Sequence, residues 1–415
     1  MADAMDIEES YDIEETWLLL AFLIVYFTYY ITKVVKKPMV VCGNTKFKEF
    51  VSRHIPIVDE HYWPTIWCFQ GQLHTLLKAI LNLRSSVKLN YRRELVMTPD
   101  DGEICLDWVD DPYDNTTSTD RLNSEDERPI VILIPGISGS SAEGYAKEMV
   151  QSVLTLGYKA VVFNNRGLGG ATLRTPRTFA VTNTDDMRTV ILHIKRKHPR
   201  APVMAAGASA GGINLFHYLC NYGDECFLNG AMIVSVLYEM VQSTKSLESF
   251  PNIVLFNNTL TSDMVNRIVK QNLPMIQQSK VNLDVNHILK SQTIRQFHTR
   301  LTVPMFGYRD CESYYEEANL AGKMHKIQVP TLFMSAADDP FAPLSSIPVE
   351  EMKQQDNILL VATRYGGHAG FLEGLIPRGG GYIHKVFTQY IDAIFKHGDE
   401  LRGSLVKSKS CPNFH

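Results

Sequence analysis

The 415-residue sequence lacks the features that identify most nucleic-acid, metal and nucleotide sites. It has 41 lysines and arginines against 45 aspartates and glutamates, so its formal net charge of −4 leaves no positive excess for nucleic-acid phosphates. Its seven cysteines form no Cys-x-x-Cys pair, which excludes the usual zinc and dithiol motifs. The glycine-rich segment 164–170 lacks the lysine and Ser/Thr of a P-loop, and its Arg166 is expected to be structural. We expect no nucleic-acid partner, no metal and no organic cofactor.

Charged residues are also missing from residues 17–31, although many acidic residues precede them. With Val34 and Val35 the apolar segment reaches roughly 18 to 20 residues, enough for a helix across most of a hydrocarbon core. A cleaved signal peptide fits poorly, because the preceding residues are acidic and no small-residue cleavage site follows. We expect a single transmembrane anchor over residues 17–35 after an acidic tail over residues 1–16. A buried core helix is the alternative.

The orientation of this anchor stays open. Lys33, Lys36 and Lys37 follow the apolar segment and no lysine or arginine precedes it, so the positive-inside rule places the rest of the chain in the cytosol. Against this, Asn115 and Asn257 begin glycosylation sequons, which only a lumenal domain could use.

From residue 129 onward, short apolar runs alternate with helical stretches, as in parallel strands joined by crossover helices. We expect strands at residues 130–134, 160–163, 202–206, 231–236, 330–334 and 358–362. The predicted fold is an α/β-hydrolase fold, a mostly parallel sheet flanked by helices. Its expected parts are a membrane-proximal extension (36–90), a first core segment (91–236), a helical cap (237–328), a second core segment (329–400) and a C-terminal tail (401–415).

The segment Gly-Ala-Ser-Ala-Gly over residues 207–211 follows a predicted strand and precedes a predicted helix. Gly-x-Ser-x-Gly in this context is a nucleophile elbow, in which the serine sits on a tight turn with no room for neighbouring β-carbons. We therefore predict Ser209 as a catalytic nucleophile.

A serine hydroxyl needs a general base, and histidine has the suitable pKa. His368 stands in a glycine-flanked loop directly after the last predicted strand. Asp339 follows another strand end and is predicted to orient the histidine, whereas Asp338 is expected to face solvent or cap the turn. The order Ser209, Asp339, His368 is that of α/β-hydrolases. The backbone N–H groups of Ala210 and Ile137 are predicted to form the oxyanion hole.

The sequence resembles the membrane-anchored α/β-hydrolase-domain (ABHD) lipid hydrolases, in the branch of the medium-chain phospholipase and its acylglycerol-lipase relatives. The resemblance extends from the anchor to about residue 398, and the matching stretches are 36–38, 62–68, 162–167, 175–178, 305–308 and 366–374. Two positions depart from the pattern. Ala210 stands where relatives tend to have Met or Leu, which shrinks a wall of the acyl pocket, and His298 stands where they tend to have an acidic residue.

The resemblance implies a serine hydrolase of glycerophospholipids, such as phosphatidylcholines with short or oxidised acyl chains, with the triad Ser209, Asp339 and His368. It also implies a type II orientation, opposite to the lysine count. The expected partners are a lipid substrate and the membrane. The alternatives are an acylglycerol lipase or general carboxylesterase with the same triad, and a catalytically silent lipid-binding scaffold.

Overall fold

The computed structural model describes residues 2–109, 127–377 and 380–401. Nine strands form one sheet in the order β1-β9-β8-β7-β6-β4-β5-β3-β2. Their bounds are β1 (Met39–Cys42), β2 (Tyr91–Met97), β3 (Glu103–Val109), β4 (Ile130–Ile134), β5 (Lys159–Asn164), β6 (Val203–Ala208), β7 (Gly230–Val234), β8 (Thr331–Ala336) and β9 (Ile358–Thr363). Strands β4 to β9 pair in parallel, and β1, β2 and β3 pair antiparallel. The predicted fold class and its six parallel strands are confirmed.

Helices cover both faces of this sheet, because side chains along each strand point alternately to opposite faces. Ile130, Ile132 and Ile134 of β4 join one apolar cluster, and Val131 and Leu133 join the other. The first cluster includes residues of helices α5 (Asp185–Lys197) and α6 (Ala210–Tyr222). The second includes residues of α2 (Thr45–His54), α4 (Gly144–Thr155) and α15 (Tyr382–His397).

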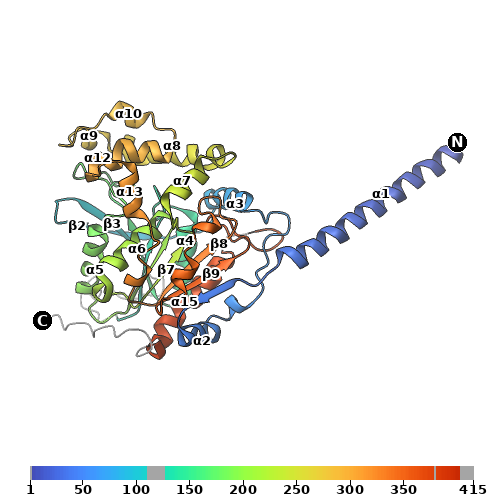
Figure 1. Cartoon of the computed structure of the whole chain (residues 1–415), viewed down its shortest axis with the longest axis horizontal. Coiled ribbons are helices and arrows are strands. Elements are labelled where there is room, and N and C mark those ends of the chain that lie inside the picture. The colour runs from blue at the N-terminus through green and yellow to red at the C-terminus, as the bar shows by residue number, and fades with distance from the viewer. Residues whose placement is uncertain (1, 110–126, 378–379, 402–415) are drawn as a thin grey trace.

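The chain between β7 and β8 is helical and lies over one end of the body (Figure 1). Its α-helices are α7 (Met240–Glu248), α8 (Asn258–Met264), α9 (Leu273–Ile276), α10 (Val285–Leu289), α11 (Ile294–Phe297), α12 (Val303–Phe306) and α13 (Cys311–Ala318). A short helix, α14 (Val349–Met352), lies between β8 and β9. His298 is buried in this region and its Nδ1 lies 3.2 Å from the Tyr315 hydroxyl. Burial lowers the pKa of His298 to about 4, so it is neutral at pH 7.

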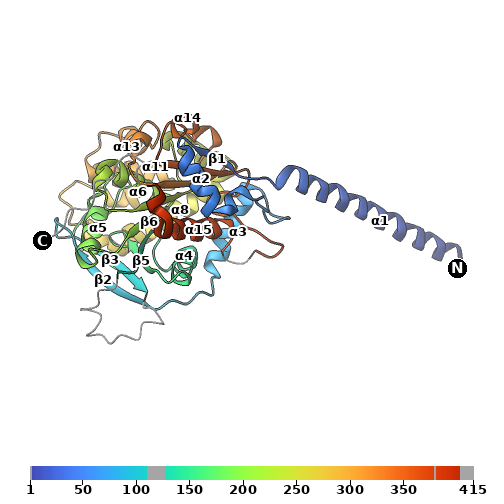
Figure 2. The same ribbon diagram turned by 90° about the horizontal axis from the view of Figure 1, so that it is seen from below.

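Helix α1 (Ala2–Tyr29) continues into a π-helical turn over Tyr30–Val34 and leaves the body (Figures 1 and 2). Its segment Glu15–Val34 has a mean hydropathy of 1.7 and is long and apolar enough to cross a membrane. The residues that follow fold against the body. Strand β1 completes one edge of the sheet, and α2 and α3 (Gly71–Leu83) pack on the core.

Candidate active site

Ser209 occupies a strained turn between β6 and α6. Its φ and ψ are 52° and −124°, in a region that residues with a β-carbon rarely adopt. The flanking glycines are required by space: a β-carbon on Gly211 would lie 2.3 Å from the carbonyl oxygen of Ile134, and one on Gly207 would lie 2.6 Å from the carbonyl oxygen of Gly211. The turn therefore presents the Ser209 hydroxyl above the carboxyl end of the sheet.

The structure brings the three predicted side chains together. His368 Nε2 lies 3.0 Å from Ser209 Oγ. On the other side of the ring, His368 Nδ1 lies 2.9 Å from Asp339 Oδ2 and 3.2 Å from Asp339 Oδ1. These three residues follow strands β6, β8 and β9, so the parallel strand ends place them at one edge of the sheet.

The carboxylate of Asp339 is buried and held by the backbone. Its Oδ1 accepts hydrogen bonds from the N–H groups of Phe341 at 2.7 Å and Ala342 at 3.2 Å. The Phe341 ring stacks on the His368 imidazole, with ring centroids 4.1 Å apart and an interplanar angle of 28°. The carboxylate and the ring fix the orientation of the imidazole in a site that is largely shielded from water.

The loop carrying His368 is fixed from two sides. Its own N–H donates to Thr75 Oγ1 of α3 at 2.9 Å, and the next N–H, of Ala369, donates to Ser235 Oγ at 2.9 Å. Gly367 has a φ of +59°, and a β-carbon there would lie 2.3 Å from the carbonyl oxygen of Gly71. Sequence reasoning missed Thr75 and Ser235. Ser235 directly follows β7, so the strand-end rule could have found it, but Thr75 sits in a leucine-rich helix and gives no such signal.

Contrary to expectation, Asp338 does not face solvent. Its Oδ1 accepts the Gly367 N–H at 2.9 Å, and its Oδ2 is buried with no hydrogen-bond partner among the described residues. Burial, together with the nearby negative charge of Asp339, raises the pKa of Asp338 to about 7, despite the opposing backbone hydrogen bond. The side chain turns inward because the loop of His368 packs over it.

The loop after β4 runs past Ser209: a β-carbon on Gly136 would lie 3.4 Å from Ser209 Cβ. The Gly136 N–H is already used, since it donates to the Tyr145 hydroxyl at 2.8 Å. By contrast, the N–H groups of Ile137 and Ala210 have no acceptor within the described part of the chain. Both donors are therefore free to bind an oxygen of a bound molecule.

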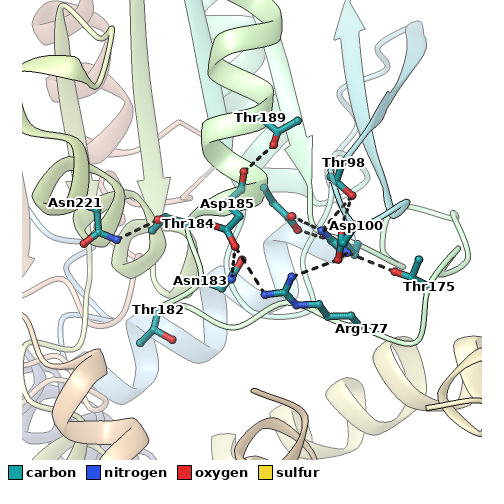
Figure 3. A network of polar contacts seen from close by, with 12 residues as sticks. Thr98, Asp100, Thr175, Arg177, Thr182, Asn183, Thr184, Asp185, Thr189 and Asn221 are labelled. Carbon is teal, nitrogen blue, oxygen red and sulfur yellow. Dashed lines mark hydrogen bonds and ion pairs between the residues drawn. The ribbon is translucent and has the colours of Figure 1, made fainter. Parts of the chain in front are cut away.

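Arg166 is structural, as expected. Its side chain is 3% exposed, and its guanidinium binds Asp186 at 2.5 Å and Asp100 at 2.7 Å. Figure 3 shows the surrounding network, in which Asp100 also pairs with Arg177 at 3.3 Å. The pKa of Asp100 lies well below its usual range, chiefly because Arg166 donates to it. The network joins the turn after β2, the loop after β5 and the start of α5.

Comparison with known proteins agrees with the fold. Residues 129–375 match the family described as the alpha/beta hydrolase fold. The chain is 40% identical to Phospholipase ABHD3 of Homo sapiens over 384 residues, which cover 92% of this chain and 91% of that protein. The chain belongs to the ABHD3 phospholipase family of the α/β-hydrolase superfamily. It is therefore an enzyme of a serine hydrolase family.

More distant relatives carry related names. Protein abhd-3.2 of Caenorhabditis elegans is 31% identical over 89% of this chain and 94% of its own length. Monoacylglycerol lipase of Saccharomyces cerevisiae is 26% identical over 78% of this chain and 80% of its own length.

Proposed function

We propose that this chain is a membrane-anchored phospholipase in which Ser209 attacks an acyl ester of a glycerophospholipid. The observation that carries the proposal is the hydrogen-bonded chain from Ser209 through His368 to Asp339, with distances of 3.0 and 2.9 Å. In this arrangement His368 can accept the proton of the neutral Ser209 hydroxyl. The carboxylate of Asp339 then balances the positive charge that His368 gains. The mechanism needs no metal or organic cofactor.

The reaction has two acyl-transfer steps. Ser209 Oγ attacks the ester carbonyl while His368 Nε2 accepts its proton, and Asp339 stabilises the resulting imidazolium. His368 then gives that proton to the departing lysophospholipid alkoxide, which leaves an acyl-enzyme. In the second step a water molecule gives a proton to His368 and attacks the acyl carbon. Fatty acid is released when Ser209 Oγ recovers the proton.

Each step passes through a tetrahedral intermediate whose oxygen carries negative charge. We assign its stabilisation to the N–H groups of Ile137 and Ala210, which have no acceptor within the described residues. Donors that are fixed before the reaction pay no reorganisation cost, and one such donor typically contributes about 3 kcal/mol.

Membrane lipid is the proposed substrate because the family relationship to Phospholipase ABHD3 is combined with an apolar segment at Glu15–Val34. We propose that this segment spans the membrane and that residues 237–328 form a cap over the site. Asn257 is fully buried, so the folded chain has no room for a glycan there. Asn115 lies outside the described residues, and the orientation of the anchor stays open.

The test compares lipid classes with purified full-length chain in vesicles. We expect fatty acid release from phosphatidylcholine and none from the Ser209→Ala variant. The relative named Monoacylglycerol lipase favours a second candidate function, hydrolysis of monoacylglycerol. Fast hydrolysis of monoacylglycerol with no hydrolysis of phosphatidylcholine would overturn the phospholipase proposal in favour of that one.

A further inference from the structure

Helix α3 has its polar and apolar faces reversed relative to a helix packed on a soluble core. Its buried side chains are His74, Thr75 and Lys78, and Lys78 Nζ binds Glu148 Oε2 at 2.8 Å inside the protein. Its exposed large apolar side chains are Leu73, Leu76, Ile80 and Leu83, and Leu83 is 86% exposed. The spacings of three, four and three residues place these four on one stripe of the helix. A helix in water would be expected to bury that stripe.

The chain before α3 contacts α1 within the apolar segment itself. The Tyr26 hydroxyl donates to the carbonyl oxygen of Ile66 at 2.5 Å, and the Tyr30 hydroxyl donates to that of Pro64. Tyr26 lies eight residues before Val34, the last residue of the apolar segment, which corresponds to about 12 Å along a helix axis. If α1 spans a bilayer, residues 63–67 therefore lie beside it below the membrane surface.

A second apolar loop, at residues 375–376, is fixed to the loop 63–67. The indole Nε1 of Trp67 donates to the carbonyl oxygen of Leu375 at 2.6 Å. Leu375 and Ile376 are 69% and 70% exposed, and the indoles of Trp63 and Trp67 are exposed as well. Glu373, which precedes this loop, is paired with Lys385 at 2.9 Å.

We propose that the stripe of α3, the loop 63–67 and the loop 375–376 form a membrane platform that is inserted in the bilayer crossed by α1. Figures 1 and 2 both show α3 on the side of the body from which α1 leaves. The proposal rests on the proposed anchor, which fixes the bilayer as the occupant of this surface. Burying several leucines and two indoles in the interfacial region is favourable, and indoles are enriched there.

Hydrogen bonds join the platform directly to the loop that carries His368. Thr75, on the inner face of α3, accepts the His368 N–H at 2.9 Å, and His74 Nδ1 accepts the Leu372 N–H at 3.3 Å. A bilayer held against the outer face of α3 thus lies directly behind the residues that position His368. The platform is expected to let a membrane lipid reach Ser209 without crossing bulk water.

The direct test measures lipid contact at single positions. Leu76→Cys and Leu375→Cys are labelled with a nitrobenzoxadiazole dye in the full-length chain and reconstituted in phosphatidylcholine vesicles. Leu95→Cys is the matched control, because Leu95 is also an exposed leucine but lies on the edge strand β2 (Figure 1). The signal from the native cysteines, which are buried or half-buried in the described residues, is subtracted with the unsubstituted chain.

We expect the dye at 76 and 375 to emit at shorter wavelength than at 95 and to be quenched by lipids with nitroxide-labelled acyl chains. Equal emission at all three positions would overturn the platform. So would a blue shift without lipid quenching, which would indicate contact with a second copy of the chain.

A functional test separates the platform from the chemistry. In the triple variant Leu76→Gln, Ile80→Gln, Leu83→Gln we expect hydrolysis of vesicle phosphatidylcholine to fall at least about tenfold. Hydrolysis of a soluble ester, p-nitrophenyl butyrate, should stay at the wild-type rate. Normal rates with both substrates would contradict the platform alone. An inactive wild type would contradict the proposed function instead, and release of wild type from vesicles by alkaline carbonate would contradict both anchor and platform.

Discussion

The backbone N–H of His368 donates a hydrogen bond to Thr75 Oγ1 at 2.9 Å, although the two residues are 293 positions apart in the chain. Thr75 also donates to the carbonyl oxygen of Gly71 at 2.7 Å, so its hydroxyl has one fixed orientation. The helix that we propose to contact the bilayer therefore sets the position of His368, the proposed general base.

Replacing Thr75 with valine keeps the shape of the side chain and removes the acceptor. A buried N–H without a partner costs about 1–3 kcal/mol, so the His368 loop should shift and kcat for a soluble ester should fall about tenfold or more, with little change in KM. Thr75→Ser restores the hydroxyl and should recover most of the rate. Equal activity of the serine and valine variants would show that the hydrogen bond is not used in positioning.

Asp339 and Asp338 are adjacent carboxylates with different roles in this arrangement. Asp339→Asn should lower kcat by about 10⁴, because an amide cannot hold the imidazole in the tautomer that accepts the serine proton. Asp338→Asn keeps an oxygen that can accept the Gly367 N–H at 2.9 Å and should retain most of the activity. Steady-state kinetics with a soluble ester distinguishes the two, and a reversed order of activities would assign the acid to Asp338.

The pKa of Asp338, raised to about 7 by burial, makes the free energy of unfolding depend on pH. Between its unfolded value of 3.8 and about 7, the folded chain holds a proton that the unfolded chain has lost. Asp338 therefore makes stability fall as pH rises through this window, and the effect is complete above it. The free energy of unfolding of Asp338→Asn should exceed that of wild type most at pH 8 and least at pH 4. Urea unfolding of both chains across this range checks the sign, and a constant difference would contradict it.

Arg166 holds two carboxylates in a buried network, and removing it should be costly. Arg166→Met leaves Asp186 without its partner in the interior and should lower the free energy of unfolding by about 3–5 kcal/mol. Arg53→Met is the control. The ion pair of Arg53 with Glu400 is exposed and should contribute less than about 1 kcal/mol to the free energy of unfolding. Chemical denaturation of the two variants in detergent gives the comparison. Similar losses for both would mean that burial does not decide the strength of these pairs.

The six central strands could be predicted because each contains a short, buried apolar run that is followed by glycine or polar residues. The same strand ends led to Ser209, Asp339 and His368, since parallel strands end at one edge of the sheet. Ile137 and Ala210 followed from chain position alone, because their contribution is a backbone N–H. The catalytic roles of these five residues stay proposals.

Other parts could not be predicted, for physical reasons. Strand β1 has four residues, and its partner β9 lies more than 300 positions later, so its pairing leaves no local pattern. In α3 the leucine period is visible, but periodicity alone does not tell which face is buried. An aqueous setting favours the leucines inside, whereas the structure buries His74 and Lys78. Asp338 was misplaced because the fold of the loop after β9, not its own neighbours in sequence, covers it.

The most direct measurement is the site of covalent labelling by a fluorophosphonate, read by peptide mass spectrometry and compared with hydrolysis by Ser209→Ala. We predict a single adduct on Ser209 in the wild-type chain. We also predict no adduct in Ser209→Ala, together with a loss of phospholipid hydrolysis of at least about 10³-fold. An adduct on another residue, or a Ser209→Ala variant that still hydrolyses phospholipid, would contradict the role assigned to Ser209.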